Sequence, residues 1–214
     1  MSIGTRRKQL TLQWMTGTAM MIALVIVMGN TPLGLIRLPL LTATTLHIPV
    51  IIATLVMGPE SGIATGFVFG VVSLLGNLTG ASFFSPFFIN PLVSILPRII
   101  FPVFVYVICR ILERVTARFD KHRLIAFVGA SALGTLIHTA MVMGMIYLLN
   151  HEKIAQMLVS GAGVPEAIAQ SGVGAGIAAI GLTNGVPEAI VAAVIAPVVA
   201  LALDRALGRI VIRK

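Results

Sequence analysis

The chain has 214 residues, of which 57% are apolar and only 10% are charged. A water-soluble domain of this length cannot bury so much apolar surface, so the composition indicates a membrane protein with several spans. The formal net charge is +8, and its placement along the chain says more than its size. The single cysteine, Cys109, excludes an intrachain disulfide and a cysteine metal cluster.

Six apolar segments are predicted to be transmembrane helices, because a bilayer core of about 30 Å requires roughly 20 apolar residues per helix. We expect an all-α fold, a polytopic bundle of six transmembrane helices that forms one membrane domain over residues 1–214. In chain order the expected spans are roughly 12–28, 47–57, 61–78, 91–112, 124–149 and 176–203. The second segment is too short to cross a bilayer by itself, and would do so only through packing against the other helices. An outer loop over 150–175 is expected to contain a short helix near 165–170.

The basic residues are distributed unevenly between the two sides of this arrangement. Most of the 15 lysines and arginines fall in three clusters, at residues 6–8, 110–123 and 205–214, all on the side that holds both termini. Arg37 and Lys153 fall on the other side. Since basic loops stay in the cytoplasm, both termini are predicted to be cytoplasmic. The clusters flank spans and act as topological anchors, which removes nucleic acid as a partner.

Polar side chains within the spans gather in the half of the membrane away from the termini. At about 1.5 Å per residue, Arg98 lies roughly 18 Å, His138 roughly 22 Å and Glu188 roughly 24 Å from the cytoplasmic ends of their helices. Asn77, Asn90 and Asn184 also fall in this outer half. Polar groups in a bilayer are costly and usually face a cavity or one another. The pattern predicts a pocket that opens to the outside.

The segment "NPLVSILPRII" places an arginine among apolar residues. Asn90 suits an N-cap and Pro91 the first helical position, so a helix is expected to begin there. Asn90, Ser94 and Arg98 are then spaced four apart and are expected to share one face.

Three roles for Arg98 remain open. It can form a salt bridge with Glu188, or donate to carbonyl groups that Pro97 and Pro102 leave without a helical partner. Alternatively, its guanidinium can bind an anionic group of a ligand.

The other polar residues also have two interpretations each. His138 is either a packed, hydrogen-bonded core residue or a ligand contact. Asn77 is expected mainly to end its span. The sequence "GVPEAI" begins at Gly163 and again at Gly185, and an early proline with a glutamate favours a helix start. We expect this role for Glu166 and leave Glu188 undecided.

Small residues recur at intervals of four on two helices. Gly62, Gly66 and Gly70 predict a helix that approaches a neighbour closely. Ala19 and Ala23 do the same on the first span, where either internal packing or a protein partner accounts for them.

Recognisable catalytic motifs are missing from the sequence. It contains no His-Glu-x-x-His, no Gly-x-Ser-x-Gly and no Walker-type phosphate loop. We therefore predict no enzyme activity, no catalytic residues, no metal site and no cofactor, and a chain that cannot power transport by itself.

Two segments carry a resemblance to a known family. "LHIPVIIATLVMGPESGIATGFVFGVVSLL", at 46–75, and "NPLVSILPRIIFPVFVYVICRI", at 90–111, resemble S components of energy-coupling factor (ECF) vitamin transporters, of the pantothenate-type branch. The resemblance implies a six-helix protein of the bacterial cell membrane that captures a vitamin at the outer face. It would then dock on a transmembrane T protein with two ABC-type ATPase subunits. In this family an Ala-x-x-x-Ala motif of the first helix contacts the T protein, and Ala19 and Ala23 match it.

The resemblance also assigns expected roles in ligand binding. Pantothenate carries a carboxylate, which Arg98 would suit, and an amide and two hydroxyls, which Asn90, His138 and Asn184 would suit. The residues expected to contact the substrate are Asn77, Asn90, Ser94, Arg98, His138, Asn184 and Glu188. Cobalamin, pyridoxine and hydroxymethylpyrimidine stay open as substrates. Two other functions also stay open, namely an autonomous secondary transporter with Glu188 as its coupling acid and a membrane enzyme that uses His138 with Glu188.

Overall fold

The computed structural model describes residues 3–32, 34–37, 42–78, 85–159 and 172–206. The long helices are α1 (Ile3–Gly29), α3 (Pro59–Leu78), α6 (Leu96–Val115), α7 (His122–Val159) and α9 (Val173–Ala206). The short elements are α2 (His47–Met57), α4 (Ser85–Phe88), α5 (Pro91–Ser94) and the antiparallel strands β1 (Leu35–Arg37) and β2 (Thr42–Thr44). The all-α prediction is confirmed, and the small hairpin is an addition to it.

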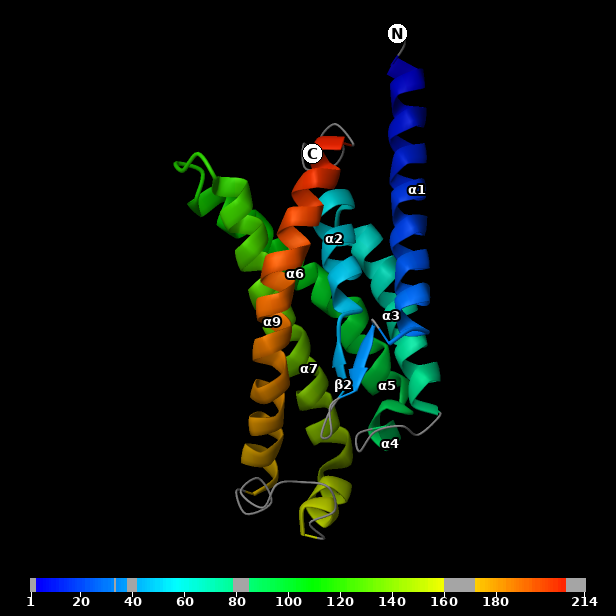
Figure 1. Cartoon of the computed structure of the whole chain (residues 1–214), viewed down its shortest axis with the longest axis vertical. Helices are drawn as coiled ribbons and strands as arrows, with labels where there is room; N and C mark the ends of the chain where they lie inside the picture. The colour runs from blue at the N-terminus through cyan, green and yellow to red at the C-terminus, as the bar shows by residue number, and fades with distance from the viewer. Residues whose placement is uncertain (1–2, 33, 38–41, 79–84, 160–171, 207–214) are drawn as a thin grey trace.

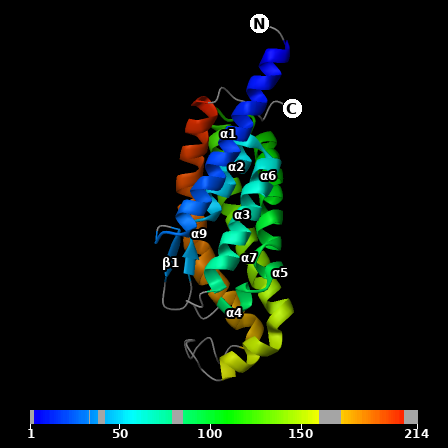
Figure 2. The same ribbon diagram turned by 90° about the vertical axis from the view of Figure 1, so that its right-hand side faces the viewer.

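The long helices run alongside one another as an elongated bundle (Figures 1 and 2). The start of α1 and the end of α9 lie at the same end of the molecule, which we call the terminal end. The β1–β2 hairpin lies part-way along the bundle, and α4 and α5 lie toward the opposite end. Within the described residues, five helical stretches are long and apolar enough to cross a membrane, and α2 is a shorter apolar helix.

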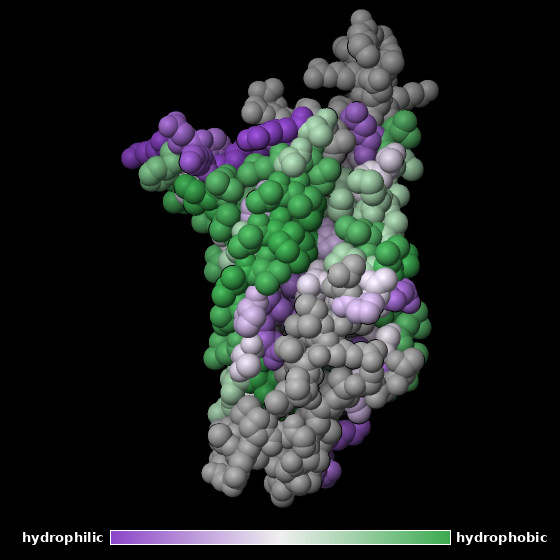
Figure 3. Space-filling model, in the orientation of Figure 1, coloured by the Kyte–Doolittle hydropathy of each residue, from purple (hydrophilic) through white to green (hydrophobic). Residues whose placement is uncertain are grey.

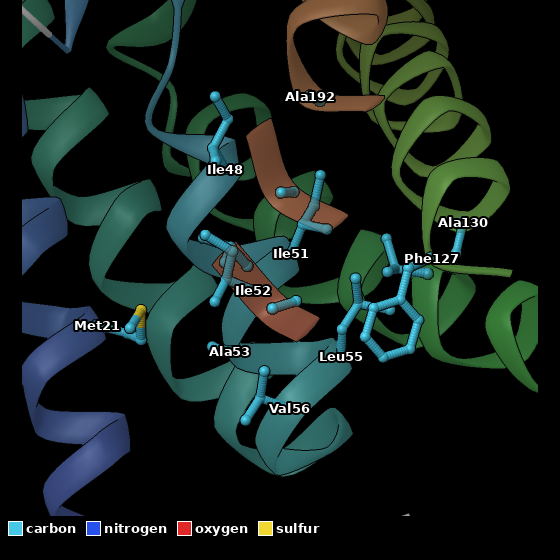
Figure 4. Packing of buried hydrophobic residues seen from close by; sticks show 14 of the residues in the cluster. Met21, Ile48, Ile51, Ile52, Ala53, Leu55, Val56, Phe127, Ala130 and Ala192 are labelled. Atoms are coloured by element: carbon cyan, nitrogen blue, oxygen red, sulfur yellow. The ribbon is translucent and has the colours of Figure 1, made fainter. Parts of the chain in front are cut away.

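Helix α2 is an interior element. All 11 of its residues are buried, and it packs against α1, α3, α6 and α9. Figure 4 shows Met21 of α1 on one side of α2 and Phe127 of α7 on the other. Eleven residues rise only about 16 Å, which is about half of a bilayer core. The predicted second span is thus a helix that the others surround.

The predicted close approach of the glycine-rich helix is confirmed. A β-carbon on Gly66 of α3 would lie 2.1 Å from the carbonyl oxygen of Arg98, and one on Gly70 would lie 2.8 Å from the Cα of Ile95. A β-carbon on Gly62 would lie 2.1 Å from Oγ1 of Thr54 in α2. The glycines therefore let the backbone of α3 lie directly against α2, α5 and α6.

The structure differs from the expected spans in two places. The segment expected as one helix over 91–112 is interrupted at Ile95, between α5 and α6. Helix α7 does not stop at the expected end, Leu149, but continues through a kink at Asn150 (φ −135°, ψ 24°) as far as Val159. The first part of the expected outer loop is therefore helical. The helix expected near 165–170, with Glu166, lies outside the described residues.

The second copy of "GVPEAI" is not a helix start. It lies well inside α9, which begins at Val173, and Pro187 is an internal proline of that helix. Glu188 is thus a mid-helix residue and not a first-turn acid.

Large apolar side chains are exposed along the outer faces of the bundle. Val107 of α6 and Val194 and Val198 of α9 are among them. Figure 3 shows hydrophobic residues over much of the visible face and hydrophilic residues gathered where α6 and α7 meet at the terminal end. Such a surface suits contact with lipid acyl chains, as expected of a protein that crosses a membrane several times.

Candidate functional site

Arg98 lies in the first turn of α6 and is 3% exposed. Its Nη1 donates to the carbonyl oxygen of Val93 over 2.6 Å. In a continuous helix that carbonyl would accept from the residue four positions later, which is Pro97 and has no N–H. Arg98 therefore satisfies the carbonyl that Pro97 leaves unpaired, as one of its three possible roles predicts.

The rest of the guanidinium group lies between aromatic rings. Its carbon lies 5.3 Å from the ring centroid of Phe69 and 5.1 Å from that of Phe88, within the range of a cation–π interaction. Nε has no hydrogen-bond partner in the described part of the chain. Arg98 thus keeps a donor unused in the bundle interior.

Glu188 of α9 does not form a salt bridge with Arg98. Its Oε1 accepts a hydrogen bond of 2.6 Å from the backbone N–H of Thr44, the last residue of β2. The carboxylate therefore links the hairpin to α9. No salt bridge between Arg98 and Glu188 joins α6 to α9 in the described residues.

His138 of α7 is packed but has no hydrogen bond from either ring nitrogen among the described residues. It is 4% exposed, and its ring centroid lies 4.8 Å from that of Phe101 and 5.8 Å from that of Phe69. The nearby hydroxyl of Thr135 donates instead to the carbonyl of Ser131. The hydrogen-bonded core interpretation of His138 therefore finds no support in these contacts.

His47, the first residue of α2, joins this group. It is 1% exposed, and its ring lies nearly parallel to that of His138 with centroids 6.3 Å apart. Backbone groups of Thr44 and Glu188 lie near its ring, but neither nitrogen makes a hydrogen bond of regular geometry within the described ranges. Sequence reasoning missed His47, because it opens a segment that is buried on all sides and shows no polar face. A histidine at the start of an apolar run too short to span was the available signal.

Asn90 and Ser94 serve the local backbone. Asn90 is the N-cap of α5, as predicted, and its Oδ1 accepts from the N–H of Leu92 over 3.0 Å. The hydroxyl of Ser94 donates to the carbonyl oxygen of Phe88. Asn90 therefore begins α5, and Ser94 links α5 to α4.

Asn77 and Asn184 also make local bonds. Nδ2 of Asn77 donates to the carbonyl of Ser73, and its Oδ1 accepts from the hydroxyl of Ser85, which links α3 to α4. Nδ2 of Asn184 donates to the carbonyl of Ile180 one turn earlier in α9. Among the residues expected to contact substrate, Arg98 and His138 are thus the ones that the structure brings together around one shared aromatic ring, that of Phe69.

Ala19 and Ala23 are exposed on α1. The inward face of that helix is formed by other residues, since Nε1 of Trp14 donates to the carbonyl of Met57 and the hydroxyl of Thr18 lies 2.8 Å from that of Ser61. Internal packing therefore does not account for the two alanines, which leaves them available to lipid or to a partner.

The terminal end carries a second charged cluster. Nη1 of Arg123 lies 2.5 Å from Oδ2 of Asp204, and its Nε lies 3.8 Å from Oε1 of Glu113. A groove of about 320 Å³ beside them is lined by Arg110, Glu113, Arg114, Ala117 and His122. In this lining Arg110 lies 3.7 Å from Glu113 as an ion pair, whereas Arg98 has no ion pair with a described residue. Across the described chain, no group of three or more His, Cys, Asp or Glu side chains is placed to hold a metal ion.

The arrangement is therefore a bundle of membrane-spanning helices with a polar, partly unpaired cluster in its interior and exposed small residues on its first helix. No curated protein matches the sequence. The family model for the substrate-specific component of ECF transporters matches residues 13–200, and the chain belongs to that family.

Proposed function

We propose that this protein captures a small anionic vitamin, pantothenate first, with Arg98 as the residue that binds its carboxylate. The observation that carries the proposal is the state of Arg98: it is almost fully buried, donates to one carbonyl, and has no ion pair with any described residue. Glu188 acts on Arg98 only through space, so within this family of transporter subunits a specific ligand is the natural source of an anion in direct contact.

The energetics support a ligand role for Arg98. An unpaired charge in the middle of a membrane costs about 2.5–3.5 kcal/mol on insertion scales. A carboxylate can accept two parallel hydrogen bonds from a guanidinium, and such charge-assisted bonds are the strong ones. The rings of Phe69 and Phe88 lie against the guanidinium, and the side chain is almost fully buried. A ligand carboxylate that reaches Arg98 therefore meets a preorganised partner.

The test is binding of labelled vitamins to the purified protein and to its Arg98→Ala variant. The panel contains pantothenate together with cobalamin, pyridoxine and hydroxymethylpyrimidine. We expect pantothenate to bind the wild type and to lose at least about 30-fold in affinity in the variant, since a buried charge pair contributes about 2–5 kcal/mol and about 1.4 kcal/mol is tenfold. Arg114→Ala is the matched control, because Arg114 is exposed at the terminal end.

Two results would overturn parts of the proposal. Unchanged pantothenate binding by Arg98→Ala makes Arg98 a structural residue that serves only the Val93 carbonyl. Binding of an uncharged vitamin alone leaves the family membership intact and makes the substrate assignment wrong.

We also propose that both termini are cytoplasmic, in the bacterial cell membrane, and that α1 docks on a T protein that carries two ABC-type ATPases. The exposure of Ala19 and Ala23 supports this docking face, because small side chains let two helices approach closely. Replacing both alanines by tryptophan should spare vitamin binding and prevent co-purification with the T protein. Val107→Trp on the outer face of α6 is the control. Assembly that survives the double substitution would exclude this face.

The same preparation separates a binding subunit from an autonomous transporter. Reconstituted alone in liposomes, the protein should bind pantothenate without accumulating it. Uptake without the ATPase module would favour a secondary transporter.

A further inference from the structure

The imidazole groups of His47 and His138 are the least satisfied buried groups of the described structure. They come from α2 and α7, which lie far apart in the sequence, and none of their four ring nitrogens makes a hydrogen bond of regular geometry there. Backbone groups of Thr44 and Glu188 lie near the His47 ring, without such geometry. In folded proteins the large majority of buried polar side-chain atoms have a partner. Two adjacent imidazole rings without hydrogen-bond partners therefore indicate side chains that bind a ligand and not another part of the protein.

The two rings are continuous with the surroundings of Arg98. The centroid of His138 lies 5.8 Å from that of Phe69, and the Arg98 guanidinium lies 5.3 Å from the same phenyl ring. His47 extends the cluster toward α2, at 6.3 Å from His138. On the next residue of α7, the hydroxyl of Thr139 also lacks a partner among the described residues. One small molecule that reaches Arg98 would therefore meet the imidazoles as well.

The chemistry of the three side chains defines what they can recognise together. A guanidinium only donates hydrogen bonds, so it selects an anionic acceptor. A neutral imidazole donates through one nitrogen and accepts through the other. Its best partner is a group that does both, such as a hydroxyl or a secondary amide.

The geometry points to His47 and His138 as the residues that bind a hydroxyl or amide group of an anionic ligand, next to the carboxylate at Arg98. This inference rests on the proposed function and adds the residues that distinguish a hydroxylated acid from a plain one. His47 is the new member of the site.

The first experiment needs no ligand. Leucine is close to histidine in size but has no polar atom, so His47→Leu and His138→Leu remove the unpaired nitrogens with little change in packing. We expect both variants to have a higher melting temperature than the wild type in the same detergent. His122→Leu, at the bend between α6 and α7, is the control: its Nδ1 lies 3.2 Å from the carbonyl of Phe119, and no gain is expected. A lower melting temperature for both site variants would show that the imidazoles stabilise the fold, and would overturn the inference.

The second experiment compares pantothenate with an analogue in which both hydroxyls are replaced by hydrogen. The wild type should prefer pantothenate, and each leucine variant should bind it about tenfold more weakly while binding the analogue as before. His47→Gln and His138→Gln, which keep a donor and an acceptor, should recover part of the preference. Equal losses for both ligands would mean that the histidines act on packing, and would contradict the inference.

The two experiments also separate this inference from the proposed function. If the wild type binds neither compound, the pantothenate assignment fails. The melting temperatures of the leucine variants then still show whether the two imidazoles stabilise the fold or destabilise it.

Discussion

Arg98 and Arg123 are two arginines of one bundle in opposite surroundings. Arg123, at the terminal end, has Asp204 and Glu113 as ion-pair partners. Arg98, in the interior, has two aromatic rings and one carbonyl, and its Nε has no partner in the described chain. The difference teaches that a cation in a membrane protein is structural where the protein supplies its anion. Where the protein does not, the cation can serve a ligand.

The largest expected change in stability is that of Arg123→Ala. The variant leaves the carboxylate of Asp204, with a side chain 5% exposed, without its partner. Breaking a buried pair costs about 3–5 kcal/mol, and the partial exposure of Arg123 should reduce this to about 2–3 kcal/mol. Unfolding in micelles of increasing SDS content measures it, with Arg114→Ala as a control of near-zero effect. A loss below about 1 kcal/mol would show that the ion pair of Arg123 does little to stabilise the fold, and that Arg123 is not a structural cation.

Gly66→Ala tests how closely the Arg98 site depends on the packing of α3. Its β-carbon would lie 2.1 Å from the carbonyl oxygen of Arg98, so α3 and α6 must move apart. Overpacking of this kind costs about 1–3 kcal/mol, and ligand affinity should fall with it. Gly144→Ala, whose β-carbon meets no atom within 4 Å, should not destabilise the protein. Equal stability of the two variants would show that the helices separate without strain.

Arg98→Met should change the free energy of unfolding by no more than about 1 kcal/mol, in contrast to Arg123→Ala. The variant removes a buried charge that has no ion pair with a described residue, which favours the fold, and leaves the Val93 carbonyl unpaired, which opposes it. The same SDS titration measures the balance. A loss of stability as large as that of Arg123→Ala would show that Arg98, like Arg123, stabilises the fold.

Glu188→Gln is expected to have the smallest effect. The amide oxygen can still accept from the N–H of Thr44, so the hairpin stays tied to α9 and stability should change by about 0.5 kcal/mol or less. Glu188→Ala, which removes the acceptor, should cost about 1–2 kcal/mol in comparison. A large loss in the glutamine variant would show that the charge of Glu188 supports Arg98 through space.

Helix positions in this protein were predictable, because the length of an apolar run and the caps at its ends are local properties. Asn90 caps α5 as its sequence context indicates, and the glycines at 62, 66 and 70 mark a close contact. The spacing of Asn90, Ser94 and Arg98 did not indicate their partners, since Asn90 accepts from Leu92 and Ser94 donates to Phe88 in the local backbone.

The site residues were predictable only in part, and for a physical reason. Arg98 and His138 stand out as polar groups in long helices that are otherwise largely apolar. His47 belongs to a helix that is buried on every side, so neither periodicity nor depth distinguishes it from its neighbours. That His47 and His138 meet is a property of how α2 and α7 pack, which no local pattern records.

The shortness of α2 also constrains how the protein is made. A helix of 11 residues covers about half of the hydrocarbon thickness, so it gains too little from lipid to be released into the bilayer alone. The chain must nevertheless cross there, because α3 runs in the opposite direction (Figure 1). Insertion of α2 and α3 as one helical pair, after α1, meets both requirements. The full burial of α2 is completed only when α6 and α9 also pack around it.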